Sequence, residues 1–552
     1  MKSVPVCIIG GGPVGMSLAL NLDALGVPSV IVNREPDVLV QPRGSTHNAR
    51  TMEHYRRLGL GKAIRKLGLP QEQATDVVYF TRLDGYELAR LSMPSEAQKM
   101  RALAADVETD QIPEPILRCN QMYVERLVFD HLHTRPKVEL RFGWTCVAWS
   151  EDAGGVTVEI AENATGRTET LRCAYLAGCD GAGSIVRQQL KIAYSGEATN
   201  TDQAYLSRAM VSTHIRSAEY FRASPHRLGW QNWSLNASFR SNMVSLNGRD
   251  ELILLTQLPS VEHTPDAALI AQRFLAAVGH EVSFEILGHW KWIPGRALVA
   301  DAYGAGRAVM AGDAVHLFSP TGGFGMNTGV DDAANLGWKL AALVQGWGGA
   351  RLLASYETER RPIGIRNTQL SKVFSRHVGT LQIPDCIEEE SARGTEARAR
   401  LGADLDQFGE EFASIGIQLG ARYDGSAIVV ADGSAPPADD PFAYAPSACP
   451  GGRAPHLWMA DRSSLFDHFG PGFTLLSMAR ARGEEARALA EAAAKRGVPL
   501  KLLTLDSKAA RELYGASLAL VRPDQHVAWR GDRLNDPDAL LATVTGSAAA
   551  EN

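Results

Sequence analysis

A carboxylate and a row of glycines follow a short apolar run in the middle of the chain. In the segment from 306 to 340, residues 308–311 have the pattern of a buried strand, and Gly312-Asp313 comes directly after them. Pro320 and a glycine-rich stretch then lead into a helical pattern. Such a loop presents unpaired backbone N–H groups and one fixed carboxylate at a single place, which suits a polar, flat or phosphorylated ligand.

The N-terminal segment carries a second ligand-binding pattern. Its spacing is G-x-G-x-x-G, formed by Gly10, Gly12 and Gly15. An apolar run at 4–9 precedes the glycines, and a helical pattern and a second apolar run at 30–32 follow them. This order predicts a βαβ unit that binds the pyrophosphate of a dinucleotide at the N-terminus of the helix.

The residue that binds the ribose of a dinucleotide is expected to follow the second strand. Asn33 takes this place, with Arg34 and Glu35 behind it. An Asn side chain can hydrogen-bond a ribose hydroxyl, but without the added strength that a charged carboxylate gives. The pattern leaves open whether Asn33 or Glu35 contacts the ribose.

Three further pieces place a polar side chain beside the end of an expected element. They are a Pro-Arg loop with Arg43, a helical pattern with Gln121 and Glu125, and a strand end with Asp180-Gly181. Each has an ordinary alternative: a surface arginine, an amphipathic helix and a turn aspartate. Their order along the chain is therefore more informative than any one of them.

Taken together, these pieces resemble the FAD-dependent aromatic hydroxylases, the single-component flavoprotein monooxygenases typified by p-hydroxybenzoate hydroxylase and phenol hydroxylase. The resemblance covers the whole chain and continues through residues 319–340 and 355–362. It implies a mixed α/β and α+β fold, in which a Rossmann-like FAD-binding domain carries an inserted antiparallel-sheet domain for the substrate. It also implies a thioredoxin-like C-terminal domain, here without a C-x-x-C pair.

The resemblance implies FAD as cofactor and NADH or NADPH as a transient co-substrate. The expected reaction is hydroxylation of a phenolic aromatic substrate with O2 through a flavin hydroperoxide, because side chains alone cannot insert oxygen into an arene. No second G-x-G-x-x-G follows an expected strand later in the sequence, which fits transient binding of the nicotinamide dinucleotide.

The same resemblance assigns cofactor roles to individual positions. Gly10, Gly12 and Gly15 would face the FAD pyrophosphate, and Arg43 and Gln121 would contact the ribose or ribityl region. Asp180 would contact both FAD and the nicotinamide dinucleotide, and Asp313 would bind the ribityl chain. The flavin ring would lie beside Pro320, Gly325, Met326 and Asn327. A helix N-terminus beside the ring would stabilise negative charge on the reduced flavin.

Candidates for substrate chemistry are less specific. His47, four residues past Arg43, is the expected base for the substrate hydroxyl, with a plain loop or capping histidine as the alternative. His226, Trp230 and Asn232, together with Trp233 and Asn236, lie in the strand-rich middle and are candidate substrate contacts, although aromatic residues in such sheets more often pack. His316 is expected to be structural.

The expected domain ranges follow changes in sequence character. They are 1–195 for the first part of the FAD-binding domain, 196–289 for the substrate sheet, 290–395 for the second part of the FAD-binding domain, 396–440 for a helical segment and linker, and 441–552 for the thioredoxin-like domain.

Composition narrows the classes of partner. A net charge of -6 and the lack of a basic run argue against nucleic acid and anionic membranes as ligands. The seven cysteines are scattered without a C-x-x-C pair, which favours reduced thiols and no metal site. The first apolar stretch is neither a signal peptide nor a membrane span, so a cytoplasmic protein is expected, either a monomer or a homodimer.

Two rival functions remain at this point. The segment 289–294 resembles the W-x-W-x-I-P signature of flavin-dependent halogenases, with one residue missing before the isoleucine. Alternatively, the chain is a flavin-binding or redox-sensing protein that turns over no substrate.

Overall fold

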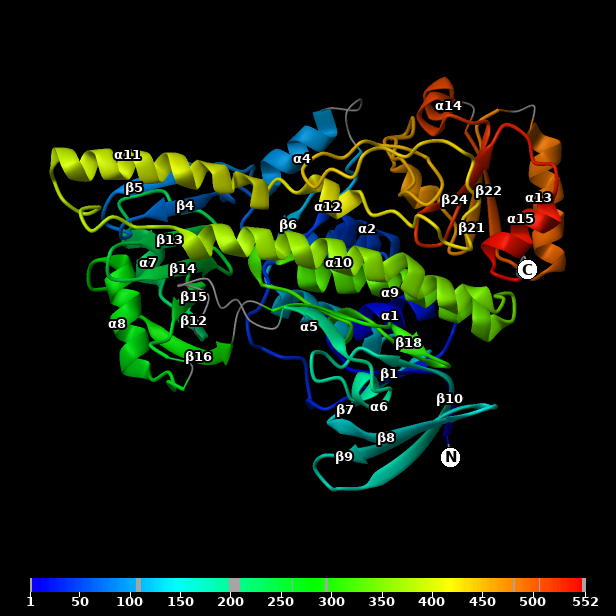
Figure 1. Cartoon of the computed structure of the whole chain (residues 1–552), viewed down its shortest axis with the longest axis horizontal. Coiled ribbons are helices and arrows are strands. Elements are labelled where there is room, and N and C mark those ends of the chain that lie inside the picture. Colours follow the sequence, from blue (N-terminus) through cyan, green and yellow to red (C-terminus); the bar gives the residue numbers. More distant parts are fainter. Residues whose placement is uncertain are drawn as a thin grey trace.

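A largely parallel sheet occupies the middle of the molecule (Figure 1). The computed structural model describes residues 2–105, 111–197, 209–260, 262–292, 296–479, 482–505 and 507–548. Five strands pair in parallel in the order β19-β10-β1-β2-β7, while β18, β8 and β9 add antiparallel pairs. Their bounds are β1 (Lys2–Ile9), β2 (Ser29–Asn33), β7 (Val138–Phe142), β8 (Trp144–Asp152), β9 (Gly155–Glu162), β10 (Thr168–Gly178), β18 (Gly304–Ala305) and β19 (Ala308–Met310).

Two helices pack against each other and against this sheet, namely α1 (Pro13–Ala24) and α9 (Phe324–Gln345). Glycines make the approach close: a Cβ on Gly329 would lie 2.6 Å from the side chain of Val14, and one on Gly337 would lie 2.6 Å from that of Asn21. Larger residues at these positions of α9 would push the two helices apart.

A second sheet of seven strands lies at one end of the molecule, in the order β16-β12-β15-β14-β13-β4-β5. Its strands are β4 (Val77–Phe80), β5 (Glu87–Leu91), β12 (Met210–Arg216), β13 (Gln231–Leu235), β14 (Arg240–Ser245), β15 (Glu251–Gln257) and β16 (Glu285–Trp292). The sheet thus takes β4 and β5 from the chain before the expected range 196–289, since β13 pairs in parallel with β4. The strand expected from residue 203 begins outside the described residues.

Helices cover both faces of the second sheet. On one face, α7 (Ala218–Ala223) and α8 (Ala267–Val278) bury Val78 and Phe80. On the other, α11 (Ala392–Asp406) packs on β5. The 30-residue helix α10 (Arg351–Thr380), about 45 Å long at 1.5 Å per residue, runs lengthwise through the molecule (Figure 1).

Short elements complete the FAD-binding part. They are β3 (Thr46–His47), β6 (Leu117–Arg118), β11 (Tyr194–Glu197), β17 (Ala297–Ala300), β20 (His316–Leu317), α2 (Ala49–Arg57), α3 (Gly61–Arg65), α4 (Glu96–Ala105), α5 (Gln121–His133) and α6 (Ile185–Gln189). β3 and β6 form a two-stranded ribbon. Among the described residues, no helix has the length and apolar character needed to cross a membrane.

The C-terminal part has its own four-stranded sheet, in the order β22-β21-β23-β24. Its elements are β21 (Phe473–Ser477), α13 (Gly483–Lys495), β22 (Leu500–Thr504), α14 (Lys508–Tyr514), β23 (Leu518–Val521), β24 (Val527–Gly531) and α15 (Pro537–Val544). Only β21 and β22 pair in parallel, an arrangement consistent with the thioredoxin-like domain that the sequence predicts.

Buried charges join this C-terminal part to α9 and α10. Both oxygens of Glu359 accept hydrogen bonds from Arg522, at 2.7 and 2.8 Å, and Lys339 donates a third at 2.6 Å. Burial alone would raise the pKa of Glu359, but the two cations outweigh it and hold that pKa far below its usual range. A second link pairs Arg453 with Glu53 of α2, and all five of these side chains are buried. The tail is therefore part of one folded unit.

Substitution of Arg522 tests this link. We expect Arg522→Met to lower the free energy of unfolding by about 3–5 kcal/mol, because Glu359 would stay buried after losing its two-point partner. Arg496→Met is the matched control, since Arg496 pairs with Asp538 near the surface and its loss should cost less than about 1 kcal/mol. Urea denaturation of both variants measures the difference, and equal losses would contradict the assignment.

Candidate active site

Four segments with expected cofactor residues meet at one edge of the central sheet. Gly10 follows β1, Asn33 ends β2, Asp180 comes just after β10, and Asp313 comes just after β19. Because these strands are parallel neighbours, their carboxyl ends lie side by side, the usual position of a ligand in such sheets. Backbone hydrogen bonds from Gly10 N to Val32 O (2.8 Å) and from Cys179 N to Ile9 O (2.7 Å) hold the ends together.

The glycines of the first loop have different surroundings. A Cβ on Gly15 would lie 2.0 Å from Gly10 O, and one on Gly10 would lie 2.2 Å from Cys179 O, so these two glycines allow close packing. Gly12 has no atom within 4 Å of a Cβ built on it. It is also the N-cap of α1 and provides no side-chain cap for the first N–H groups of that helix. This open, donor-rich place fits a pyrophosphate.

Asn33, the last residue of β2, and the two residues after it have different surroundings. Asn33 accepts a hydrogen bond from Gly11 N at 2.9 Å and donates one to Glu35 O at 3.1 Å, so its amide is used to hold the glycine loop. The side chains of Arg34 and Glu35 are both solvent-accessible and contact each other at 3.4 Å. The accessible carboxylate of Glu35 can therefore accept a hydrogen bond from a ligand through the oxygen that Arg34 does not contact.

Two carboxylates line the same edge of the sheet. One oxygen of Asp180 accepts from Ile185 N at 2.7 Å, and the other is buried without a partner among the described residues. The side chain of Asp313 reaches solvent, yet desolvation by the surrounding protein raises its pKa, and the nearby Arg43 only partly opposes this rise. Burial likewise raises the pKa of Asp180. Both carboxylates are therefore suited to accept hydrogen bonds from hydroxyl groups of a ligand.

The Pro-Arg loop lies against the start of α5. Arg43 is exposed, and its carbonyl accepts from the side chain of Asn120 at 3.2 Å. Gln121 is buried and donates to Glu125 at 2.5 Å. Gln121 and Glu125 line a small cavity of about 10 Å³ together with His47 and the first turn of α1.

His47 is buried in this cavity, and neither ring nitrogen has a partner among the described residues. Burial lowers the pKa of His47 to about 4, so the ring is neutral. In the ribbon, Thr46 lies opposite Arg118 and His47 lies opposite Leu117. Because side chains alternate along a strand, His47 faces away from Arg118 and the second sheet. His316 instead forms a buried pair with Asp332 at 2.7 Å.

The loop before α9 is fixed to the same ribbon. Asn327 donates to Thr46 O at 2.9 Å and to Gly323 O at 2.6 Å, and its own oxygen accepts from Asn48 N at 2.9 Å. Gly322 and Gly323 both have positive φ, a conformation that favours glycine. Gly323 is the N-cap of α9 and provides no side-chain cap, so the N–H groups at the start of α9 near Gly325 and Met326 can reach a ligand. Pro320 begins this loop and is exposed.

The structure separates the three expected substrate contacts. Trp230 is buried beside the ribbon, where the guanidinium of Arg118 lies 3.9 Å from its ring centroid. Asn232 is fully buried and bonds to the backbone of Gly229, and His226 bonds to Gly85 O at 2.8 Å and packs on Phe80. Phe80 belongs to the face that α7 and α8 cover, so His226 lies away from the ribbon and the loop before α9.

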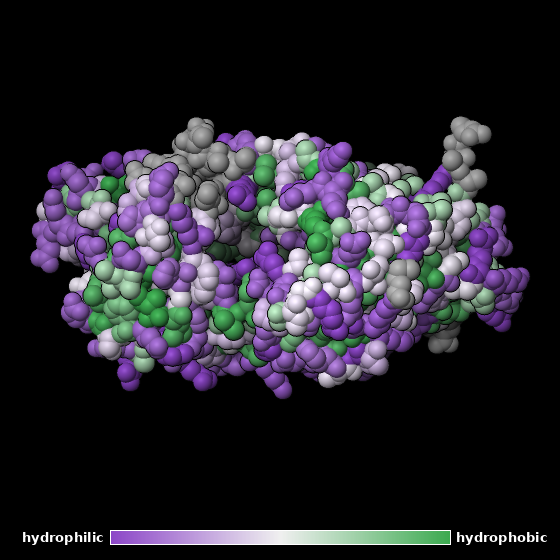
Figure 2. All heavy atoms as spheres, turned by 90° about the horizontal axis from the view of Figure 1, so that it is seen from below, coloured by the Kyte–Doolittle hydropathy of each residue, from purple (hydrophilic) through white to green (hydrophobic). Residues whose placement is uncertain are grey.

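Other aromatic residues occupy the face toward the ribbon. Tyr79 stacks with Trp233 at 6.2 Å, and Trp292 donates to Ser212 at 2.8 Å. In the space-filling view, the surface is hollowed between the lobe of the second sheet and the central part (Figure 2). Asn236, another candidate from the sequence, accepts hydrogen bonds from Ser238 N and Phe239 N in a turn. In the halogenase-like segment, Ile293 and Pro294 lie outside the described residues.

Two charged residues of this region were not singled out from the sequence. Arg118 ends β6, and Glu411 ends the short helix η3 (Gln407–Glu411) that follows α11. Glu411 accepts a hydrogen bond from Gly322 N at 2.8 Å. Nothing in the charged stretch around Glu411 distinguishes it from its neighbours, so only the fold could identify it.

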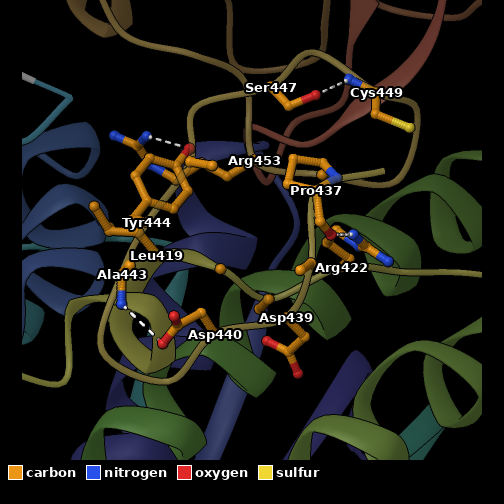
Figure 3. A pocket seen from close by; sticks show the side chains of 15 residues that line it. Leu419, Arg422, Pro437, Asp439, Asp440, Ala443, Tyr444, Ser447, Cys449 and Arg453 are labelled. Carbon is orange, nitrogen blue, oxygen red and sulfur yellow. Dashed lines mark hydrogen bonds between the residues drawn. The ribbon is translucent and has the colours of Figure 1, made fainter. Parts of the chain in front are cut away.

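A separate pocket lies in the linker before the C-terminal sheet (Figure 3). In it, Arg422 donates to Pro437 O at 2.5 Å and Arg453 donates to Tyr444 OH at 3.1 Å. Its cavity of about 30 Å³ admits roughly two water molecules and no aromatic ring. The pocket is therefore no candidate for the substrate.

Comparisons with known proteins agree with this geometry. The FAD binding domain family matches residues 3–371, and the aromatic-ring hydroxylase C-terminal family matches residues 447–548. An FAD-dependent monooxygenase of Emericella nidulans is 32% identical over 98% of this chain and 90% of its own. A 4-methyl-5-nitrocatechol 5-monooxygenase of Burkholderia is 31% identical over 98% of this chain and 96% of its own.

The solved structures include a similar enzyme with bound flavin. The rebeccamycin biosynthetic enzyme RebC with reduced flavin is 33% identical, covers 99% of both chains and has a TM-score of 0.86. The fold, the cofactor FAD and the enzyme class expected from the sequence are thereby confirmed. The chain belongs to the FAD-dependent aromatic-ring monooxygenases.

Proposed function

We propose that this chain hydroxylates a phenolic aromatic substrate, with NADH or NADPH as reductant and O2 as oxygen donor. One observation carries the proposal: two helix N-termini without side-chain caps, those of α1 and α9, lie at the same sheet edge as Asp180 and Asp313. The relative that acts on 4-methyl-5-nitrocatechol supports a phenolic substrate.

The residues of the first loops would hold the adenine half and the pyrophosphate of FAD. Gly12 leaves room at the N-terminus of α1, where the helix dipole favours phosphate. We assign the ribose contact to Glu35 rather than to Asn33, because the amide of Asn33 is already used by Gly11 and Glu35. Arg43 is exposed in the neighbouring loop and would add a phosphate or ribose contact.

The residues after β19 would hold the rest of FAD. Asp313 would accept from the ribityl hydroxyls, and Asp180 offers a second acceptor to FAD or to the nicotinamide dinucleotide. The N–H groups at the start of α9 would stabilise negative charge on a neighbouring ring by about 0.3–1 kcal/mol, and up to about 2 kcal/mol where partly buried. When bound, FAD supplies the activation of O2 for oxygen transfer.

The second sheet would hold the substrate. Tyr79, Trp230 and Trp233 give its ribbon-facing side a buried or half-buried aromatic surface. Aromatic side chains offer a flat ring both contact area and exclusion of water. The halogenase alternative is less favoured, because the match in the segment 289–294 lacks one residue.

Turnover of phenols tests this function. We expect the purified protein to show flavin absorbance and to oxidise NADH or NADPH faster when a simple phenol or a nitrocatechol is added. Mass spectrometry should find the ring heavier by one oxygen atom. Peroxide without a hydroxylated ring, or a product that forms only with chloride, would contradict the proposal.

A pair of glycine variants tests the site proposed for the pyrophosphate. Gly12→Ala should leave folding intact but reduce FAD retention, because the added methyl enters open space where the pyrophosphate is expected. Gly15→Ala should destabilise the fold itself by about 3 kcal/mol or more, because its methyl would meet Gly10 O. Thermal unfolding without added FAD and the flavin content after purification separate the two effects. Full FAD retention by Gly12→Ala would contradict the placement.

A further inference from the structure

Arg118 is a buried cation that forms no ion pair with a carboxylate of the described residues. Its side chain is 5% exposed, and among the described residues no carboxylate oxygen lies within 4.0 Å of its guanidinium. Burial lowers the pKa of Arg118 to about 9, which leaves it charged at neutral pH. A buried charge without a counter-ion is costly unless a ligand supplies one. The position therefore favours a ligand that brings negative charge.

The guanidinium is held in one orientation. It donates to Thr46 Oγ1 at 2.6 Å, lies 3.9 Å from the ring centroid of Trp230 and lies 5.9 Å from that of Phe412. A cation so fixed between aromatic rings and a hydroxyl needs little reorganisation to receive an anion. The aromatic residues beside it provide the surface that a flat ring would contact.

Glu411 is a carboxylate whose charge partly offsets the lowered pKa of Arg118, and it is held by another element. One of its oxygens accepts from Gly322 N at 2.8 Å, and the other has no hydrogen bond among the residues that the structure describes. Burial raises the pKa of Glu411 to about 7, against the effects of Gly322 N–H and Arg118. The charged or titratable groups that face it are Arg118 from β6 and Tyr79 from β4.

Both side chains lie on one side of the β3–β6 ribbon. Thr46 and Arg118 are paired across the ribbon and share a hydrogen bond, and a Cβ on Gly323 would lie 3.3 Å from Thr46. The loop that carries Gly322 and Gly323 is thus adjacent to Arg118 and is bonded to Glu411. His47 projects from the opposite face into the cavity beside α1, so it is separated from this place by the ribbon itself.

We propose that Arg118 and Glu411 together bind the ionisable hydroxyl of the aromatic substrate, with Glu411 as its proton acceptor and Arg118 as the partner of the resulting oxyanion. The assignment rests on the proposed function and replaces His47 as the base. A phenol has a pKa of about 10, so only about one molecule in a thousand is ionised at neutral pH without such help.

The proton transfer is balanced within the pair. The O–H bond of the substrate breaks, its electron pair stays on the ring oxygen, and a new O–H bond forms on the free oxygen of Glu411. Nothing is oxidised or reduced in this step. The proton passes from Glu411 to water after the product leaves, which restores the carboxylate.

Binding of a chromogenic phenol tests the pair without turnover. The FAD-loaded wild type, Arg118→Met, Glu411→Gln and the control Glu410→Gln, an exposed neighbour, are titrated with 4-nitrophenol and with its methyl ether 4-nitroanisole. Arg118→Met should weaken binding of 4-nitrophenolate by about 10–100-fold and leave the ether unaffected, because a charge-assisted contact is lost. Equal loss for both ligands would indicate a structural role and overturn the assignment.

The ionisation midpoint of bound 4-nitrophenol is a second readout, and the two variants should change it in opposite directions. The wild type should bind the ring with its ionisation midpoint below that in free solution, and Arg118→Met should abolish this shift. Glu411→Gln should lower the midpoint further, because a neighbouring negative charge is removed while an acceptor for Gly322 N–H remains. Flavin content and melting temperature equal to those of Glu410→Gln show that the variants are folded. Unchanged midpoints in both variants would overturn the proposal.

The pH profile of turnover connects the pair to catalysis. In the wild type, kcat/KM for a weakly acidic phenol should rise with pH through about 7, as Glu411 loses its proton. Glu411→Gln should lose this rise and about 10²–10⁴-fold of the rate, but much less with 4-nitrophenol at a pH where that substrate is already ionised. Turnover of phenols with unchanged profiles would refute the pair and leave the proposed function standing. If the binding changes described above occur but neither the wild type nor any variant turns over phenols, the pair stands and the proposed function is refuted.

Discussion

The close contact between α1 and α9 is the constraint on which the site depends. It is possible only because Gly329 and Gly337 present no side chain to Val14 and Asn21. With the helices this close, the N-termini of α1 and α9, which have no side-chain cap, both lie near the ends of the parallel strands. An extended cofactor with a charged middle and a polar ring edge requires such a pair of donor sites at a fixed separation. The two glycines thus set the spacing of the helices that border the site.

Charge burial ties the remaining parts to this contact. Glu359 of α10 forms one ion pair with Lys339 of α9 and another with Arg522 of the C-terminal part. At its other end, α10 meets the second sheet, where Arg240 of β14 donates a hydrogen bond to the carbonyl of Leu381 just after the helix. The C-terminal domain, which has no cysteine pair for redox chemistry, has a structural role in this arrangement.

Local patterns in the sequence predicted the cofactor FAD correctly. Glycine spacing and the carboxylates after strands depend on neighbours in the chain, so Gly12, Asp180 and Asp313 could be recognised one segment at a time. The roles proposed for these residues remain predictions. Two findings depended on distant contacts: β4 joins the second sheet through β13, and the amide of Asn33 is used by Gly11.

The contacts proposed for the substrate could not be identified from the sequence for the same reason. His226 and Asn232 occur in a strand-rich segment, but which face of a sheet a side chain occupies depends on what packs against it. Glu411 becomes notable only because it reaches Gly322 from a segment 89 residues away. No pattern within its own segment marks it.

The ion pairs between the tail and the helices also bear on how enzymes of this architecture can be recombined. A chimera that exchanged only the part after residue 447 would pair foreign cations with the native Glu53 and Glu359, and a single mismatch would strand a charge in the interior. Functional crossovers are then confined to boundaries that keep each acid with its base. The tail would diversify in step with α2, α9 and α10, as a co-inherited portion of the scaffold.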